Sequence, residues 1–156
     1  MKKTIIIATL ILSLIILSGC NSNNSLDNTV VEEIRDDQIT VFKAQECGCC
    51  GGYIAELQRQ GLKVDVKSVV DVTPKKDEYN IPNNMRSCHT TRVGNYFVEG
   101  HVPMAAMNKL LEEKPDIDGI SLPGMPSGSA GMPGPKTEKF KIYAIKNGQT
   151  SLFMEI

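Results

Sequence analysis

The chain has 156 residues, of which 41% are hydrophobic and 22% are charged, and these proportions fit a globular protein of about one domain. Its formal net charge is -1, and removal of Lys2 and Lys3 with an N-terminal signal would make it two units more negative. Such a charge leaves no basic field for a phosphate backbone, which argues against nucleic acid as a partner.

The N-terminus has the pattern of a bacterial export signal. Lys2 and Lys3 precede an almost entirely apolar stretch over residues 5–17. This stretch has the length of a signal peptide and is shorter than the ~20 apolar residues that a membrane-spanning helix needs. We therefore expect residues 1–19 to be a signal peptide and the mature protein to lie outside the cytoplasm, in the cell envelope.

The apolar stretch ends in the sequence Leu-Ser-Gly-Cys at 17–20. This order resembles the lipobox of bacterial lipoproteins, in which the cysteine is lipidated and becomes the new N-terminus. We expect Cys20 to carry a lipid that anchors the protein to a membrane. Residues 20–37, which are rich in Asn and Ser at their start, are then expected to form a flexible tether.

A folded domain is expected over 38–156, and its first elements predict a strand, a helix and a second strand. Residues 39–44 are β-branched and aromatic, as in a strand. Residues 51–60 have the apolar face of a helix, and Gly61 is a natural helix end. Residues 62–70 alternate between apolar and charged side chains, which is typical of a strand. This order places the cysteines of 47–50 on a strand-to-helix turn.

Capping residues, prolines and turn residues predict the remaining elements. The chain should form a small α/β sandwich of thioredoxin-like character, with helices flanking the sheet and a C-terminal β-hairpin. The expected elements are a short helix opening at Thr73 and Pro74, extended structure over 88–98, a helix from Val102 to before Pro115, a short strand at 120–122, a loop over 123–135, and a hairpin of 140–145 and 151–156 around Asn147-Gly148.

Apart from Cys20, the cysteines occupy two places. Cys47, Cys49 and Cys50 lie in the sequence CGCC, and Cys88 stands beside His89. The helix expected after CGCC should stabilise thiolates through its N-terminal amides and its dipole. Both metal binding and disulfide exchange require thiolates, so the cluster predicts chemistry rather than packing.

Two interpretations of these cysteines involve no metal. Four cysteines could form two structural disulfides, as in many exported domains, although the adjacency of Cys49 and Cys50 makes two converging bridges awkward. Alternatively, Cys47 and Cys50 have CxxC spacing and could act as a thiol-disulfide oxidoreductase. This second interpretation leaves Cys49 and Cys88 without a role.

A soft-metal site uses all four thiols and is the interpretation that we favour. Zinc usually draws on two well-spaced cysteine pairs, whereas CGCC crowds three sulfurs into four residues. Cu(I) accepts low coordination numbers and bridging thiolates. We therefore expect a copper site of one or more ions.

Three other residues are candidate ligands. Met125 and Met132 lie in a Gly/Pro loop that offers no packing face, whereas Met107 is expected in the core. His101 precedes a helix start, where it could cap the helix, donate to a carbonyl or bind metal. The role of His89 stays open, because neighbours in a strand face opposite sides.

Five blocks in order resemble the CopG-like metal-binding proteins, a family linked to bacterial copper resistance and long filed as a domain of unknown function. The resemblance covers residues 38 to about 133. The blocks are CGCC at 47–50, SCHT at 87–90, VEGHVP at 98–103, LPGMP at 122–126 and GSAGM at 128–132.

The resemblance implies a thioredoxin-like fold, a location outside the cytoplasm and a copper site on Cys47, Cys49, Cys50 and Cys88. It further implies that His101, Met125 and Met132 are ligands or support the ligands. Members of the family are proposed to cycle copper between Cu(I) and Cu(II), which would make the protein a copper oxidoreductase rather than a store. A copper-efflux or electron-transfer protein is then an expected partner.

Overall fold

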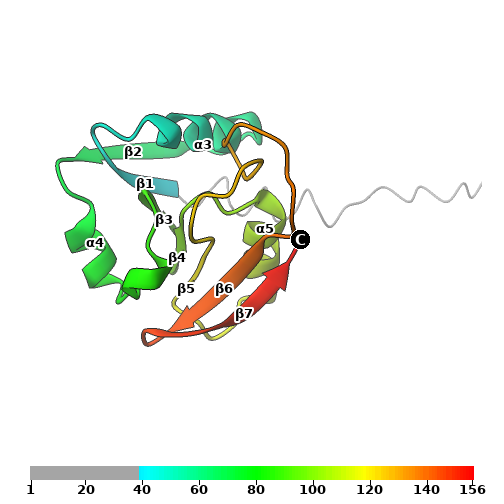
Figure 1. The fold of residues 1–156 in the computed structure, drawn as a ribbon. Coiled ribbons are helices and arrows are strands. Elements are labelled where there is room, and N and C mark those ends of the chain that lie inside the picture. Colours follow the sequence, from blue (N-terminus) through cyan, green and yellow to red (C-terminus); the bar gives the residue numbers. More distant parts are fainter. Residues whose placement is uncertain (1–38) are drawn as a thin grey trace, which may run out of the picture.

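The computed structural model describes residues 39–156 (Figure 1). The signal peptide predicted over 1–19, the lipidated Cys20 and the tether over 20–37 lie outside the described residues, and they stay predictions. Within 39–156, no helix combines the length and the apolar character that crossing a bilayer requires.

Seven strands form one sheet in the order β2-β1-β3-β4-β5-β6-β7. β-branched and aromatic residues are frequent in these segments, as strands favour. The bounds are β1 Ile39–Ala44, β2 Val64–Val69, β3 His89–Val93, β4 Tyr96–Glu99, β5 Gly119–Ser121, β6 Lys141–Lys146 and β7 Gln149–Glu155.

Three α-helices and one 3-10 turn connect the strands. The α-helices are α3 Gly48–Arg59, α4 Thr73–Glu78 and α5 Met104–Glu113, and the 3-10 turn η1 covers Asn83–Met85. Pro74 opens α4, where its missing N–H costs nothing. Lys114 adopts the left-handed conformation that ends many helices, and Pro115 follows it.

Both parallel strand pairs are joined through a helix. β1 pairs with β2 in parallel, and α3 connects them. β4 pairs with β5 in parallel, and α5 connects those two. Parallel neighbours need such crossovers, whereas the remaining pairs are antiparallel. The arrangement brings the start of α3 and the start of β3 close together, because β1 and β3 are neighbours.

The sheet carries packed side chains on both faces. Tyr53 and Leu57 of α3 and Met107 of α5 pack in one buried cluster that includes Val98 of β4. Phe97, the neighbour of Val98, belongs instead to a second cluster, with Ile81, Met85 and Ile145. Successive residues of a strand point to opposite faces, so α3 and α5 cover one face and the α4–η1 segment covers the other.

The predicted α/β fold with flanking helices is confirmed, whereas its thioredoxin likeness stays a prediction. The C-terminal hairpin is also confirmed: Asn147 and Gly148 both have positive φ, as a type I′ turn requires. The helix predicted over 51–60 begins earlier, at Gly48. Cysteine and glycine are weak helix formers, so the local pattern conceals its first turn.

Candidate metal centre

The CGCC sequence forms the start of α3. Cys47 is the N-cap residue, and Cys49 and Cys50 lie in the first helical turn. Cys50 is buried, whereas Cys47 and Cys49 are half-buried. The first-turn N–H groups and the positive end of the helix dipole therefore lie beside the three sulfurs, as the sequence predicted.

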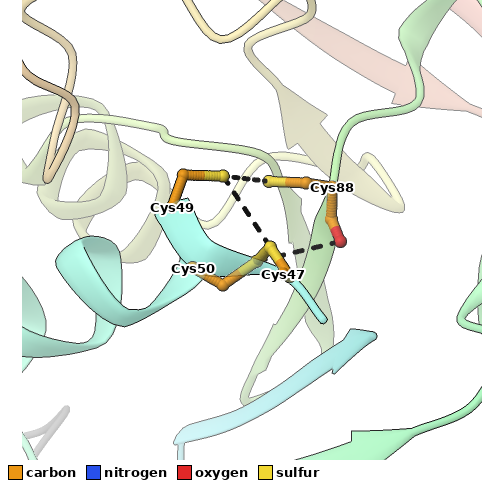
Figure 2. Close-up of side chains that lie close together, drawn as sticks. All are labelled: Cys47, Cys49, Cys50 and Cys88. Atoms are coloured by element: carbon orange, nitrogen blue, oxygen red, sulfur yellow. Dashed lines mark hydrogen bonds between the residues drawn. A yellow bond between two sulfur atoms is a disulfide. The ribbon is translucent and has the colours of Figure 1, made fainter. Parts of the chain in front are cut away.

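Cys88 joins these three cysteines in space (Figure 2). Its Sγ lies 3.6 Å from Cys49 Sγ, which in turn lies 3.7 Å from Cys47 Sγ. Cys50 Sγ lies 3.9 Å from the carbonyl oxygen of Cys88. All four sulfurs fall within 4.8 Å of one another. The fold thus brings together the four thiols that the sequence singled out.

Two of the four sulfurs are joined. Cys47 and Cys50 form a disulfide with a Cα–Cα distance of 5.5 Å, and Cys49 and Cys88 are free. This is the pairing that CxxC spacing predicts. A disulfide leaves no thiolate on either partner, so the oxidised pair and a four-thiolate metal site are alternative states of the same side chains.

Two buried histidines face Cys88 from the core side. His89 Nδ1 lies 3.3 Å from Cys88 Sγ, and His101 Nε2 lies 3.4 Å from it. The three side chains form a second group whose ligand atoms all lie within 4.8 Å of one another. β3 begins at His89, so Cys88 precedes the strand and the alternation of strand neighbours does not separate the two side chains.

A hydrogen bond to a carbonyl fixes the tautomer of His101. Its Nδ1 lies 2.8 Å from Ala130 O, and a carbonyl oxygen can only accept, so Nδ1 carries the hydrogen. Nε2 then directs a lone pair toward Cys88. His101 does not cap a helix, because α5 begins at Met104 with Pro103 as its N-cap residue. Of the three roles left open, the structure shows donation to a carbonyl by one nitrogen, while the other nitrogen faces Cys88.

Burial disfavours the charged forms of both histidines and of Cys88. Burial first, and then His101 and Lys76, lower the pKa of His89 to about 3. Burial also lowers the pKa of His101. For Cys88, burial and then the neighbouring Cys49 thiol raise the pKa to about 12. Metal binding at this cysteine must therefore release a proton.

The loop over 123–135 covers the cysteines and delivers one thioether to them. Met125 Sδ lies 4.0 Å from Cys49 Sγ. The Met125 backbone has a φ of 47°, a conformation that residues with a Cβ rarely adopt. Met132 is half-buried in the same loop, and among the residues of 39–156 its thioether forms no hydrogen bond to a cysteine sulfur, unlike that of Met125. The structure therefore places the thioether of Met125 beside the cluster, whereas the role of Met132 stays a prediction.

The ring of Tyr53 packs against both histidines, a contact that the sequence did not predict. Its buried ring lies 4.5 Å from that of His89 and 5.4 Å from that of His101, measured between centroids. Its hydroxyl lies 3.5 Å from the sulfur of Met107, which is in the core as predicted. The sequence signal was its position six residues after Cys47, on the buried face of α3.

A described family matches the part of the chain that contains Cys88, His101 and Met125. The family described as "Protein of unknown function, DUF411" matches residues 85–132. No curated protein matches the chain.

Two solved structures are similar to this one. The structure titled "Copper resistance protein copG- Form 2" is 37% identical, with a TM-score of 0.70, and the match covers 77% of this chain and 98% of that one. The structure titled "Copper resistance protein copG- Form 1" has the same identity and TM-score, with 76% and 96% covered.

Proposed function

The chain belongs to the CopG-like copper resistance family, and on this premise we propose that it is a lipid-anchored protein outside the cytoplasm that captures copper through its cysteine cluster. The observation that carries this proposal is the set of four cysteine sulfurs within 4.8 Å of one another. Copper is the cargo of this site, and copper resistance is the role that its capture would serve.

The chemistry of the donors fits copper. The cluster offers thiol sulfurs, the Met125 thioether and two neutral imidazoles, and it contains no carboxylate. Soft sulfur ligands select Cu(I), and oxygen-seeking ions such as Ca²⁺ and Mg²⁺ find no partner here. His89 presents Nδ1 to Cys88, and its buried Nε2 has no hydrogen-bond partner in the described residues.

We assign the capture of Cu(I) to Cys47, Cys49, Cys50 and Cys88, with His101 and Met125 as further donors. Met132 keeps the supporting role that the family resemblance implies. Capture first requires a dithiol reductant, which gives two electrons and two protons to the Cys47–Cys50 disulfide and leaves as its own disulfide. Cys88 then gives up its proton to the metal or to solvent.

The fate of the captured copper separates two versions of this function. Copper that stays Cu(I) would be sequestered, and the protein would be a binding module. Copper that exchanges one electron with a partner protein would cycle between Cu(I) and Cu(II), and the protein would be an oxidoreductase. Turnover with an electron-transfer partner supports the second version, whereas Cu(I) that is held unchanged through repeated redox cycles contradicts it.

The test is copper loading of the reduced full chain in detergent without oxygen. We expect one or more Cu(I) ions per chain, together with protection of four thiols from alkylation. Copper well below one ion per chain, with all four thiols still open to alkylation, would contradict the proposal.

A second candidate function is thiol-disulfide exchange through Cys47 and Cys50, which the disulfide between them favours. Substitution separates the two candidates. If Cys49→Ser leaves copper binding intact while Cys47→Ser or Cys50→Ser abolishes a disulfide reductase activity, exchange is the function. If Cys49→Ser lowers the copper content and no reductase activity is found, copper capture is the function.

A further inference from the structure

Lys76 and Glu99 form a buried ion pair on the far side of Cys88 from α3. Their residues are 3% and 0% exposed, and no other Lys, Arg, Asp or Glu within 39–156 is buried. Lys76 Nζ also donates to Thr90 Oγ1 at 3.0 Å. Taking two charges out of water costs free energy that their attraction often fails to recover, so the pair is weak evidence for added stability. Its presence needs another reason.

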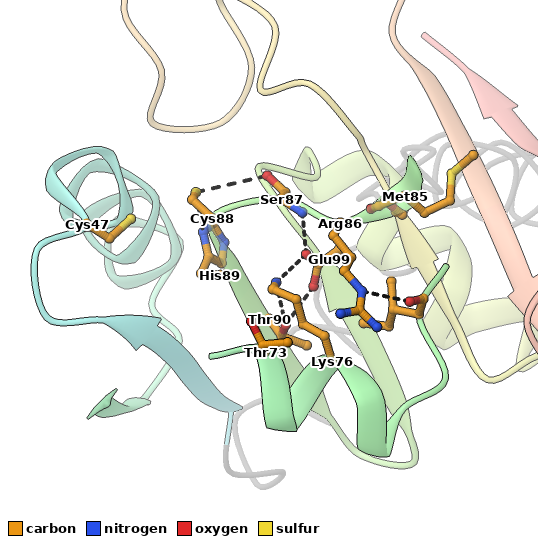
Figure 3. A network of polar contacts seen from close by, with 12 residues as sticks. Cys47, Thr73, Lys76, Met85, Arg86, Ser87, Cys88, His89, Thr90 and Glu99 are labelled. Carbon is orange, nitrogen blue, oxygen red and sulfur yellow. Dashed lines mark hydrogen bonds and ion pairs between the residues drawn. The ribbon is translucent and has the colours of Figure 1, made fainter. Parts of the chain in front are cut away.

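The carboxylate of Glu99 holds both residues that flank the dipeptide Cys88-His89 (Figure 3). Its Oε1 accepts the backbone N–H of Ser87 at 2.5 Å, directly before Cys88. Its Oε2 accepts the hydroxyl of Thr90 at 2.6 Å, directly after His89. One side chain therefore fixes both ends of the segment that supplies two potential ligands.

The backbone next to Glu99 holds the same segment. The Gly100 N–H donates to His89 O at 3.1 Å. Gly100 has a φ of 80°, and a Cβ there would lie 2.8 Å from both Cβ and Oγ of Ser87. Only glycine permits this approach. The polypeptide around Cys88 is thus fixed before, within and after the dipeptide.

We propose that Glu99 is a positioning residue of the metal centre, whose carboxylate holds Cys88 opposite Cys49 while Lys76 supplies the counter-charge. Cys88 is the one cysteine of the cluster that does not lie on α3 or at its N-cap. Its 3.6 Å distance from Cys49 Sγ therefore depends on how the Ser87–Thr90 segment is fixed. The inference rests on the proposed function, because it assigns Glu99 to that same site.

The position of Cys88 can be measured without copper. In the full chain with Cys47→Ser and Cys50→Ser, equilibration with glutathione forms the Cys49–Cys88 disulfide. Oxidised glutathione takes the two electrons and two protons of the thiols and leaves as two molecules of glutathione. Alkylation and mass spectrometry give the equilibrium constant, which reports how well the two thiols are held together.

We expect Glu99→Gln to lower this constant by about tenfold or more, because an amide offers one acceptor oxygen in place of two. Lys76→Met should change it much less, because the oxygens of Glu99 stay in place. If the ion pair only stabilised the fold, both substitutions would lower the equilibrium constant equally, since either one breaks the pair. Equal losses, or an unchanged constant in Glu99→Gln, would overturn the assignment.

Two further variants guard against loss of folding. The double variant Lys76→Met/Glu99→Gln leaves no buried charge at this position. Its equilibrium constant should be as low as that of Glu99→Gln alone. A constant in the double variant as high as that of Lys76→Met alone would overturn the assignment. Tyr96 lies at the opposite end of β4 from Glu99, and its hydroxyl donates to Pro115 O rather than to the Ser87–Thr90 segment. Tyr96→Phe removes this hydrogen bond and should leave the constant unchanged. If the wild-type chain bound no copper, the proposed function would be wrong, but the disulfide equilibrium would still measure how Glu99 positions Cys88.

Discussion

Gly52 of α3 and Gly131 of the 123–135 loop lie backbone against backbone, and a Cβ on Gly52 would stand 2.3 Å from the carbonyl oxygen of Gly131. The residue before Gly131 is Ala130, whose carbonyl fixes the tautomer of His101. The contact between the two glycines therefore sets how closely the loop approaches the metal centre.

Gly52→Ala is expected to push the loop away from α3. Overpacking of this kind lowers the free energy of unfolding by about 1–3 kcal/mol, and the displaced carbonyl and thioether should weaken Cu(I) binding by about tenfold or more. Competition with a Cu(I) chelator and denaturant unfolding measure the two effects.

Gly51→Ala is the matched control for this substitution. A Cβ on Gly51 meets no atom within 4 Å, and alanine favours a helix over glycine by about 1 kcal/mol. Copper affinity should stay unchanged and stability should rise slightly. Equal losses of copper in the two variants would show that the contact with the loop is irrelevant.

The two loop methionines should differ in their effect on copper. Met125→Leu keeps the side-chain volume and removes the thioether that lies 4.0 Å from Cys49 Sγ, so Cu(I) affinity should fall by about tenfold. Met132→Leu should lower it much less, because the Met132 thioether forms no hydrogen bond to a cysteine within 39–156 and leucine keeps most of its packing. Chelator competition on both variants checks the prediction, and a larger loss in Met132→Leu would reverse the assignment.

The stability of the metal-free protein should depend on pH through His89. Its folded-state pKa is about 3, below the ordinary 6.5, so the unfolded chain binds more protons between these values. Stability is then full above about pH 6.5 and falls as the pH drops toward 3, by up to about 1.4 kcal/mol per pH unit. Urea unfolding at a series of pH values measures the slope. His89→Gln should flatten it, and an identical slope in that variant would exclude this histidine as the cause.

Membrane attachment should depend on Cys20 alone. Cys20→Ala removes the predicted site of lipidation, so the protein should move from the membrane fraction to the soluble fraction with its copper content unchanged. Cell fractionation followed by copper analysis checks both parts. A variant that stays in the membrane fraction would contradict the lipid anchor.

Most of the fold could be predicted because its signals are local. The proline before α4, the Asn147-Gly148 turn and the alternation in β2 each act over a few residues. The first turn of α3 escaped prediction because its stabilisation comes from burial of Cys50 rather than from helix propensity. The closeness of Cys88 to the CGCC sequence was expected from chemistry, and the pairing of β1 with β3 supplies the physical reason.

The supporting residues could not be predicted, because nothing local marks them. Lys76 lies in a run of charged residues that is typical of a solvated helix face, and it is buried only because α4 packs against the sheet. Glu99 ends a strand, where a charge is ordinary. The two residues of this ion pair are 23 positions apart in the sequence and lie on a helix and a strand, so the pair forms only with the tertiary structure.

The candidate donors come from three stretches of chain, at 47–50, 88–101 and Met125, and they meet only after folding. An unfolded chain has the sulfurs without the arrangement. If the chain is exported unfolded, as we propose, it crosses the membrane without the complete donor set, and the full site can take up copper only on the side where the protein folds. Loading should in turn raise the melting temperature, since unfolding would have to release the ion.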